Sequence, residues 1–178
     1  MRSLAILVMI AAVIGSVSAA HAAPMIRVPS GTSVPLKFVT PVDSSTITQG
    51  AVVQFEVATD VLMDRYVVLR RGAPAQGVVT DVSGAGIFGK DAVVHIGFIE
   101  TTAADGRPVR LSPIAVTPGS VREAENVGAA GASSLAGAIV LGPLGLAAGA
   151  LIHGGHVAVP AGAVATSKLE HAVDVAIG

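Results

Sequence analysis

A glycine-rich segment at residues 84–91, GAGIFGKD, could bind a phosphate group. It contains GxGxxG and nearly matches the phosphate-loop pattern GxxxxGK[ST]. Both patterns bind phosphate where the glycine loop opens a helix whose N-terminal amides face the anion. The residues that follow, AVVHI, are β-branched and alternating, so they predict a strand. Asp91 also stands where the phosphate loop needs a hydroxyl, and we therefore expect a hairpin connection and no nucleotide.

Two histidines three positions apart, His153 and His156, could share a metal ion. Zinc sites need three or four ligands, and no acidic residue lies within ten positions of either histidine. We expect a polar turn here. Ser133-Ser134 lacks the GxSxG elbow of a serine nucleophile, and the acidic residues are scattered singly. The sequence therefore predicts a protein that is not an enzyme, with no metal and no cofactor.

Residues 1–22 have the pattern of a secretory signal peptide. Arg2 precedes an apolar run of 12 residues, 4–15, and the AHA sequence before Ala23 fits a cleavage site. A spanning helix needs about 20 residues, although an uncleaved anchor is the alternative. We expect an exported protein of the periplasm, free or associated with the outer membrane. The chain has no cysteine, which excludes a disulfide framework.

The composition argues against nucleic-acid binding and in favour of strands. With 11 basic and 12 acidic residues, four Phe and one Tyr, the chain lacks both a basic stripe and stacking aromatics. Apolar residues alternate with others in residues 34–38 and 53–57, as they do in half-buried strands. Further strands are expected at 66–69, 75–82, 92–100, 108–111, 156–159 and 164–177. The predicted fold is mainly β, a small antiparallel barrel or sandwich.

A turn pattern recurs three times, at residues 28–34, 69–75 and 159–165. Each copy has an apolar residue, a turn that contains glycine, and a restart with small residues. Glycine supplies the positive φ that a type II turn needs. Asp105-Gly106 is a hairpin-turn dipeptide between residues 98–102 and 108–111. The turn glycines expected to form tight corners between strands are Gly31, Gly72, Gly106 and Gly162.

The most unusual segment carries no charged side chain. Asp, Glu, Lys and Arg are absent from Asn126 to Ser167, which is 42 residues, whereas soluble elements normally show one face to water. One helix over residues 127–152 would be about 39 Å long, enough to cross a hydrocarbon core of about 30 Å. Pro143 would kink it, and Gly142-Pro143 could equally be the tip of a hairpin with arms of 15 and 9 residues.

Small residues of this uncharged tract fall on one arc of a helical wheel and include a GxxxG pair. Such stripes let helices approach closely in membranes. The residues expected to make these packing contacts are Gly131, Ala138, Gly142, Pro143, Gly145 and Gly149. The interpretation is a Gly/Ala-rich helical hairpin inserted in a β-domain, and it leaves open whether the tract contacts a membrane or packs on its own domain.

In order along the chain, these segments resemble the C-terminal β-barrel domain of TrbI-type proteins, which build channels for conjugation and type IV secretion. The resemblance covers residues 28–119, and the uncharged tract takes the place of that family's helical antenna. It is carried by VPSGT at 28–32 with Pro35, Asp60-Val61, Arg71-Gly72 with Gly77, and TAADG at 102–106 with Val109 and Leu111. The resemblance implies a barrel-like envelope protein that forms rings, and no catalytic residues.

These observations divide the chain into four parts: a signal peptide at 1–22, a β-domain at 23–125, the uncharged insertion at 126–155, and strands at 156–178 that complete the β-domain. We predict a non-enzymatic, exported cell-envelope protein whose glycine-rich segment contacts membrane lipid or identical copies, with another envelope protein as a further candidate partner. The alternative is a soluble periplasmic ligand-binding or interaction module, with the tract packed internally and residues 84–89 lining the ligand site.

Overall fold

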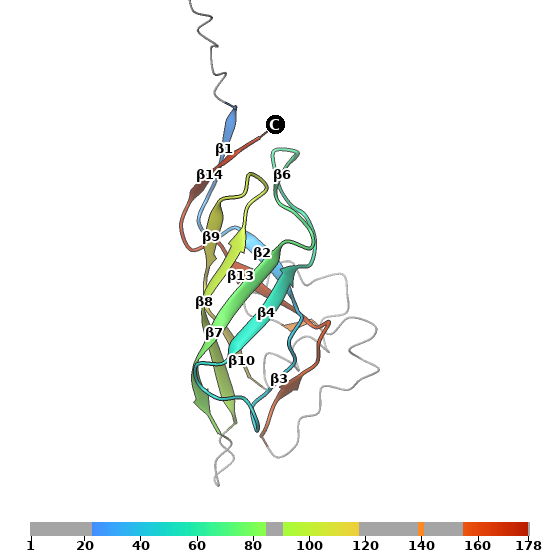
Figure 1. Cartoon of the computed structure of the whole chain (residues 1–178), viewed down its shortest axis with the longest axis vertical. Coiled ribbons are helices and arrows are strands. Elements are labelled where there is room, and N and C mark those ends of the chain that lie inside the picture. Colours follow the sequence, from blue (N-terminus) through green and yellow to red (C-terminus); the bar gives the residue numbers. More distant parts are fainter. Residues whose placement is uncertain (1–22, 85–90, 118–138, 141–154, 178) are drawn as a thin grey trace, which may run out of the picture.

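The computed structural model describes residues 23–84, 91–117, 139–140 and 155–177, and every regular element among them is a β-strand (Figure 1). The mainly β prediction is confirmed. The strands are β1 (Met25–Val28), β2 (Ser33–Phe38), β3 (Val42–Asp43), β4 (Val52–Val57), β5 (Val61–Met63), β6 (Tyr66–Leu69), β7 (Pro74–Ser83), β8 (Val93–Thr102), β9 (Pro108–Leu111), β10 (Ile114–Val116), β11 (Ile139–Val140), β12 (Ala158–Val159), β13 (Val164–Lys168) and β14 (Val173–Ala176).

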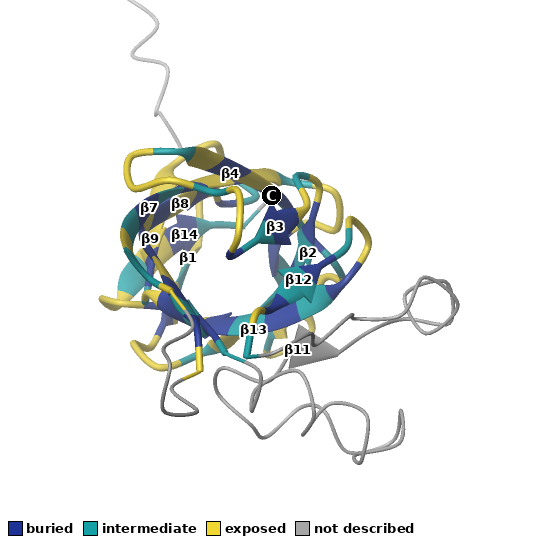
Figure 2. Ribbon diagram, turned by 90° about the horizontal axis from the view of Figure 1, so that it is seen from below, coloured by how far each residue is buried: buried dark blue, intermediate teal, exposed yellow. Residues whose placement is uncertain are grey.

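One antiparallel sheet of eight strands forms the body of the molecule. Its order is β10-β8-β7-β4-β2-β13-β11, and β9 pairs with β8 beside β10. The sheet curls around a central axis, as Figure 2 shows. The two ends of the sheet meet where the Ser112 N–H, between β9 and β10, donates to the Lys168 carbonyl of β13 at 2.8 Å. Three two-stranded ribbons, β1–β14, β12–β3 and β5–β6, complete the fold among the described strands.

The interior is filled by the alternate residues that the sequence pattern singled out. Val34, Leu36 and Phe38 of β2 are buried, while the residues between them are partly exposed. In β4, Val53 and Phe55 are buried in the same alternating way. The Phe38 and Phe55 rings pack against each other, with their centroids 4.8 Å apart. Each such side chain contributes about 1.5–3 kcal/mol by leaving water.

The recurring glycine turns are three copies of one corner. Gly31, Gly72 and Gly162 have φ of +82°, +80° and +92°. Each glycine N–H donates at 2.8 Å to a carbonyl on a neighbouring segment, and the N–H of that same neighbour donates back to the carbonyl after the glycine. The neighbours are Leu169, Val57 and Phe38 respectively. Two residues thus oppose one, which is a glycine bulge that bends the strand.

Gly106 has φ of +87° and ends the turn of the β8–β9 hairpin, where its N–H donates to the Ala103 carbonyl at 2.9 Å. The Asp-Gly dipeptide therefore lies in the hairpin that the sequence indicated.

Within residues 127–152 of the uncharged tract, the structure describes only Ile139 and Val140. They form β11, and they pair with Ala165 and Val164 at the edge of β13. At these two positions the chain is extended, so a single helix or a helical arm through them is wrong. The rest of the predicted helical hairpin, including all six packing residues from Gly131 to Gly149, lies outside the described residues.

Candidate functional site

The outer face of β4, β7, β8 and β9 carries a row of polar side chains. Strand alternation points these residues away from the apolar interior, and the antiparallel register brings them level with one another. Gln54 pairs with Gln76, Gln76 with Glu100, and Glu100 with Arg110. The row therefore places amide groups beside a carboxylate and a guanidinium on neighbouring strands.

An open groove of about 490 Å³ lies along part of this row. Gln54, Gln76 and Glu100 line it, and the backbone turn at Gly72 forms part of its rim. Glu56 also lines the groove and forms an ion pair with Lys37 of β2. Such a lining can hydrogen-bond a small polar molecule.

Phe98 is the most exposed large apolar residue among those described. Its side chain is 81% accessible, although it lies in the middle of β8. Its φ of +51° is in the left-handed region, which a bulky residue rarely adopts. Backbone strain of this kind costs about 1–3 kcal/mol and persists where the surroundings impose it.

A bulge in β8 explains the position of Phe98. Gln76 pairs with Glu100, but Val78, two residues on, pairs with Gly97, so β8 contains one extra residue. That residue shifts the alternation, so that Ile96 and Ile99 both face the interior and Phe98 faces out. Gly97 is required beside it, because a Cβ there would lie 2.9 Å from the Thr80 Cγ2.

Phe98 continues a short apolar row across three strands. Val52 of β4 is 54% exposed and pairs with Val78 of β7, which in turn pairs with Gly97, the neighbour of Phe98. We call Val52, Val78 and Phe98 the apolar row. Val52 and Phe98 are exposed and Val78 between them is half-buried, and apolar side chains that gather on one face of a sheet can contact another molecule.

The sequence contains a signal for this bulge that the strand prediction over 92–100 did not use. The residues Gly97, Phe98 and Ile99 break the alternation that His95 and Ile96 follow, and a glycine inside a strand often marks a bulge. What the sequence could not show is which of Phe98 and Ile99 would face solvent.

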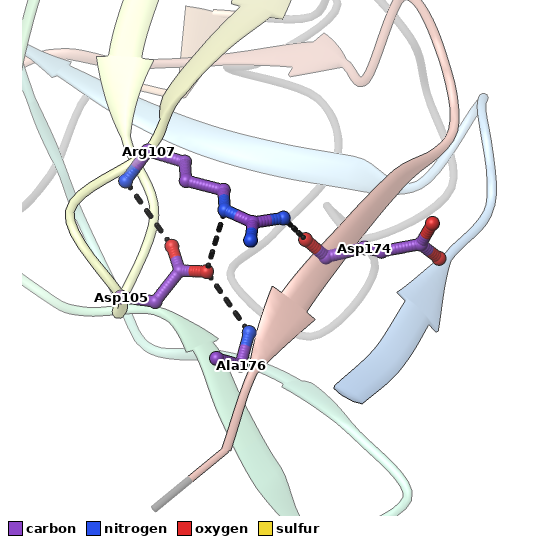
Figure 3. Close-up of polar contacts among 4 residues, drawn as sticks. All are labelled: Asp105, Arg107, Asp174 and Ala176. Atoms are coloured by element: carbon purple, nitrogen blue, oxygen red, sulfur yellow. Dashed lines mark hydrogen bonds and ion pairs between the residues drawn. The ribbon is translucent and has the colours of Figure 1, made fainter. Parts of the chain in front are cut away.

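A second polar cluster holds the C-terminal strand, and it is drawn in Figure 3. The Asp105 carboxylate accepts hydrogen bonds from the N–H of Ala176 at 2.9 Å and the N–H of Arg107 at 3.1 Å. The Arg107 Nε lies 3.4 Å from the same carboxylate, and its Nη1 donates to the Asp174 carbonyl at 2.7 Å. The β8–β9 hairpin is thereby clasped to β14.

Burial of the Asp105 carboxylate raises its pKa, but the opposing contributions are together larger. The N–H groups of Ala176 and Arg107 and the charge of the Arg107 guanidinium stabilise the ionised form, so the pKa lies below its usual value. The clasp is therefore a charged one at neutral pH, and it positions the strand rather than a reacting group.

The remaining sequence candidates fall in separate places. Residues 84–91 connect β7 to β8, whose ends pair at Ser83 and Val93, and the element that follows is a strand, as expected for a hairpin connection. Gly84 does not line the groove, and residues 85–90 lie outside the described residues. His153 and Ser133-Ser134 also lie outside the described residues.

His156 lies near the Asp43 carboxylate. The Ser45 hydroxyl donates to this carboxylate at 2.6 Å and the Ser45 N–H at 2.8 Å, and these bonds, with a smaller effect of His156, lower the pKa of Asp43. Within the described ranges, no three His, Cys, Asp or Glu residues gather closely enough to hold a metal ion.

Among the residues that the structure describes, no helix has the length and apolarity needed to cross a membrane. Comparison with protein-family models finds none that matches the chain, and comparison with curated proteins finds no match either.

Proposed function

We propose that this chain is a non-enzymatic protein of the cell envelope, exported by its N-terminal segment, whose barrel presents the uncharged tract to a membrane surface or to identical copies. The observation that carries the proposal is the pairing of Ile139 and Val140 with β13. This pairing attaches the middle of the tract to the edge of the barrel.

The attachment bears on how the tract could meet a membrane. It leaves two uncharged stretches, residues 127–138 and 141–152, of 12 residues each. A helix of that length would be about 18 Å long, short of the hydrocarbon thickness of about 30 Å. Surface contact or packing between copies therefore fits better than a helical span. The resemblance to TrbI-type barrels supports the same proposal, since those proteins assemble into rings.

The proposal is tested by altering both stretches while keeping β11. In one variant, residues 127–138 and 141–152 are replaced by Gly/Ser/Asp linkers of equal length. A matched control carries the same linker only in residues 85–90, in the β7–β8 connection. We expect the native chain and the control in the membrane fraction or in large assemblies, and the tract variant as a soluble monomer. A native chain that is itself wholly soluble and monomeric would contradict the proposal.

A second candidate function is a soluble periplasmic module that binds a small polar ligand, and the groove beside Gln54, Gln76 and Glu100 favours it. Residues 84–89 are not needed for this version. Titration of the chain with disaccharides or short peptides, followed by NMR of the Gln54 and Gln76 side-chain amides, tests it. Shifts of the Gln54 amide that vanish in Gln76→Ala support the module, and Gln54 and Gln76 amides that stay unmoved in the native chain argue against it.

A further inference from the structure

Asp105 is followed directly by a glycine, and this pair of residues can undergo a reaction of its own. Every other aspartate of the chain is followed by a residue that carries a side chain. Because glycine has no Cβ, the Gly106 nitrogen can closely approach the carboxyl carbon of the residue before it. That approach is the first step of succinimide formation, the spontaneous reaction that converts aspartate into isoaspartate.

The reaction needs no co-reactant other than water. The Gly106 nitrogen loses its proton and bonds to the Asp105 Cγ, and the hydroxyl of the protonated carboxyl group leaves with that proton as water. A second water then cleaves one of the two C–N bonds of the ring. Cleavage at Cγ restores aspartate. Cleavage at the backbone carbonyl leaves the chain linked through Cγ, with one extra CH₂ in the backbone and the carboxylate on Cα.

The folded barrel opposes each requirement of this reaction. The Gly106 N–H donates to the Ala103 carbonyl at 2.9 Å, so the attacking nitrogen is already held. One Asp105 oxygen accepts the Arg107 N–H at 3.1 Å and the other accepts the Ala176 N–H at 2.9 Å. The carboxylate therefore cannot rotate without breaking both bonds, and its side chain is only 9% exposed.

Ionisation of Asp105 adds to this protection, because the hydroxyl that leaves belongs to the protonated acid. Burial opposes ionisation, but the N–H groups of Ala176 and Arg107 outweigh it and keep the pKa of Asp105 below its usual value. At neutral pH the side chain is thus in its unreactive form.

Part of this protection comes from β14, as Figure 3 shows. The Ala176 N–H belongs to that strand, whose Asp174 carbonyl also accepts the Arg107 Nη1 at 2.7 Å. When β14 leaves the hairpin, the carboxylate loses this donor and returns to water. We propose that Asp105-Gly106 is a site of spontaneous isoaspartate formation that the docked β14 keeps unreactive, so that the modification marks chains whose C-terminal strand has opened.

Isomerisation would also make the opening permanent. The carboxylate of isoaspartate is attached directly to Cα and the turn contains one more backbone atom, so the hairpin no longer presents an acceptor at the distance of the Ala176 N–H. This inference concerns the clasp alone, and it holds whether or not the uncharged tract contacts a membrane. Replacement of residues 127–138 and 141–152 tests the proposed function and leaves the clasp intact, so the two can fail separately.

Two substitutions open the clasp without changing the reacting pair. Ala176→Pro removes the N–H that Asp105 accepts. It keeps the bond between this strand and the N-terminal segment, because there the Ile177 N–H donates to the Pro24 carbonyl at 2.8 Å. Arg107→Gln removes the guanidinium that joins the carboxylate to β14.

The full chain and both variants are incubated at pH 7.4, and isoaspartate is measured by chromatography of proteolytic peptides, where it separates from aspartate at the same mass. We expect isoaspartate at Asp105 to form at least about tenfold faster in Ala176→Pro, as for the loss of one hydrogen bond to a charged acceptor, and Arg107→Gln to be faster than the native chain. In urea, where all three chains are unfolded, their rates should be equal.

Asp43-Ser44 is the control site within the same chains, because the Asp43 carboxylate accepts hydrogen bonds from Ser45, far from β14. Its rate should not change in either variant. A variant that accelerates both sites is unfolded as a whole, and the other variant then decides. Native chain that isomerises at Asp105 as fast as in urea, or folded variants no faster than the native chain, overturns the proposal.

Discussion

Replacement of Asp105 by alanine should loosen the C-terminal strand and lower the stability of the whole barrel. The carboxylate is 9% exposed and accepts two backbone N–H groups, from Ala176 and Arg107. Hydrogen bonds to a charged acceptor contribute about 1.5–3 kcal/mol, and a part of this is offset because the carboxylate returns to water. The ion pair adds less than about 1 kcal/mol, since the Arg107 side chain is half exposed. We expect Asp105→Ala to reduce the free energy of unfolding by about 2–3 kcal/mol.

Urea denaturation at pH 7 measures this loss as a lower midpoint at an unchanged slope. Hydrogen exchange adds a local readout, because the Ala176 amide loses its acceptor and should exchange faster than amides of β4. The matched control is Asp174→Ala. Its carboxylate points away from the cluster in Figure 3 and only its carbonyl takes part, so we expect a change below about 0.5 kcal/mol.

Two results would refute the reasoning on the clasp. One is an Asp105→Ala variant whose unfolding free energy matches that of Asp174→Ala. The other is an Ala176 amide whose exchange rate does not change, because the carboxylate would then not hold β14 in solution.

Three further changes test other parts of the fold. Arg65→Gly should raise the unfolding free energy by about 0.5–1 kcal/mol, because Arg65 has φ of +76° in the β5–β6 turn; a lower urea midpoint would contradict this. Gly77→Ala should cost about 1–3 kcal/mol, because its Cβ would lie 2.8 Å from the Ile96 Cγ2, whereas Gly84→Ala, where a Cβ meets nothing within 4 Å, serves as the control in the same urea series. The pKa of Asp43 is lowered in the folded chain. The stability that its ionised carboxylate contributes is therefore fully present above the ordinary pKa of 3.8, and it is lost as pH falls through the pKa of the folded state. Asp43→Asn should therefore lose less stability than the native chain between pH 5 and pH 3, and identical losses would argue against this.

Strand alternation predicted much of the fold because most strands bury one face. β4, β6 and the β8–β9 hairpin lie close to where period-two patterns and Asp-Gly placed them. The ribbons β1–β14 and β12–β3 were not predicted as pairs, since each joins segments more than 100 residues apart and only two to four residues long. The β5–β6 turn carries Asp64-Arg65 at positive φ in place of the usual Asn-Gly, so it gave no hairpin signal.

The candidate contact surface was harder to predict than the fold. Alternation indicates that some residues of β8 face out, but the register of β7 against β8 decides which ones. That register contains two irregularities, one on each strand: the extra residue of β8 near Phe98 and an extra residue of β7 near Thr80. A sequence pattern cannot locate such a pair, because each shift is defined only by the strand opposite. The clasp was missed for a similar reason, since Asp105 and Ala176 are 71 residues apart.

The two irregularities also separate what the fold needs from what a contact would need. The second restores the pairing that the first displaces, so β7 and β8 continue in step on both sides of Phe98. The fold therefore requires an extra residue in β8 and a glycine at 97, but it places no demand on the ring of Phe98, which packs against little of the chain. A polar residue would satisfy the same backbone with less exposed apolar surface. Residues that break a local rule of folding without stabilising the structure tend to lie at functional sites. A Phe98→Ser variant should accordingly keep its free energy of unfolding, measured by urea denaturation, within about 0.5 kcal/mol of the native value. A variant that unfolds much more easily would show instead that the ring supports the barrel.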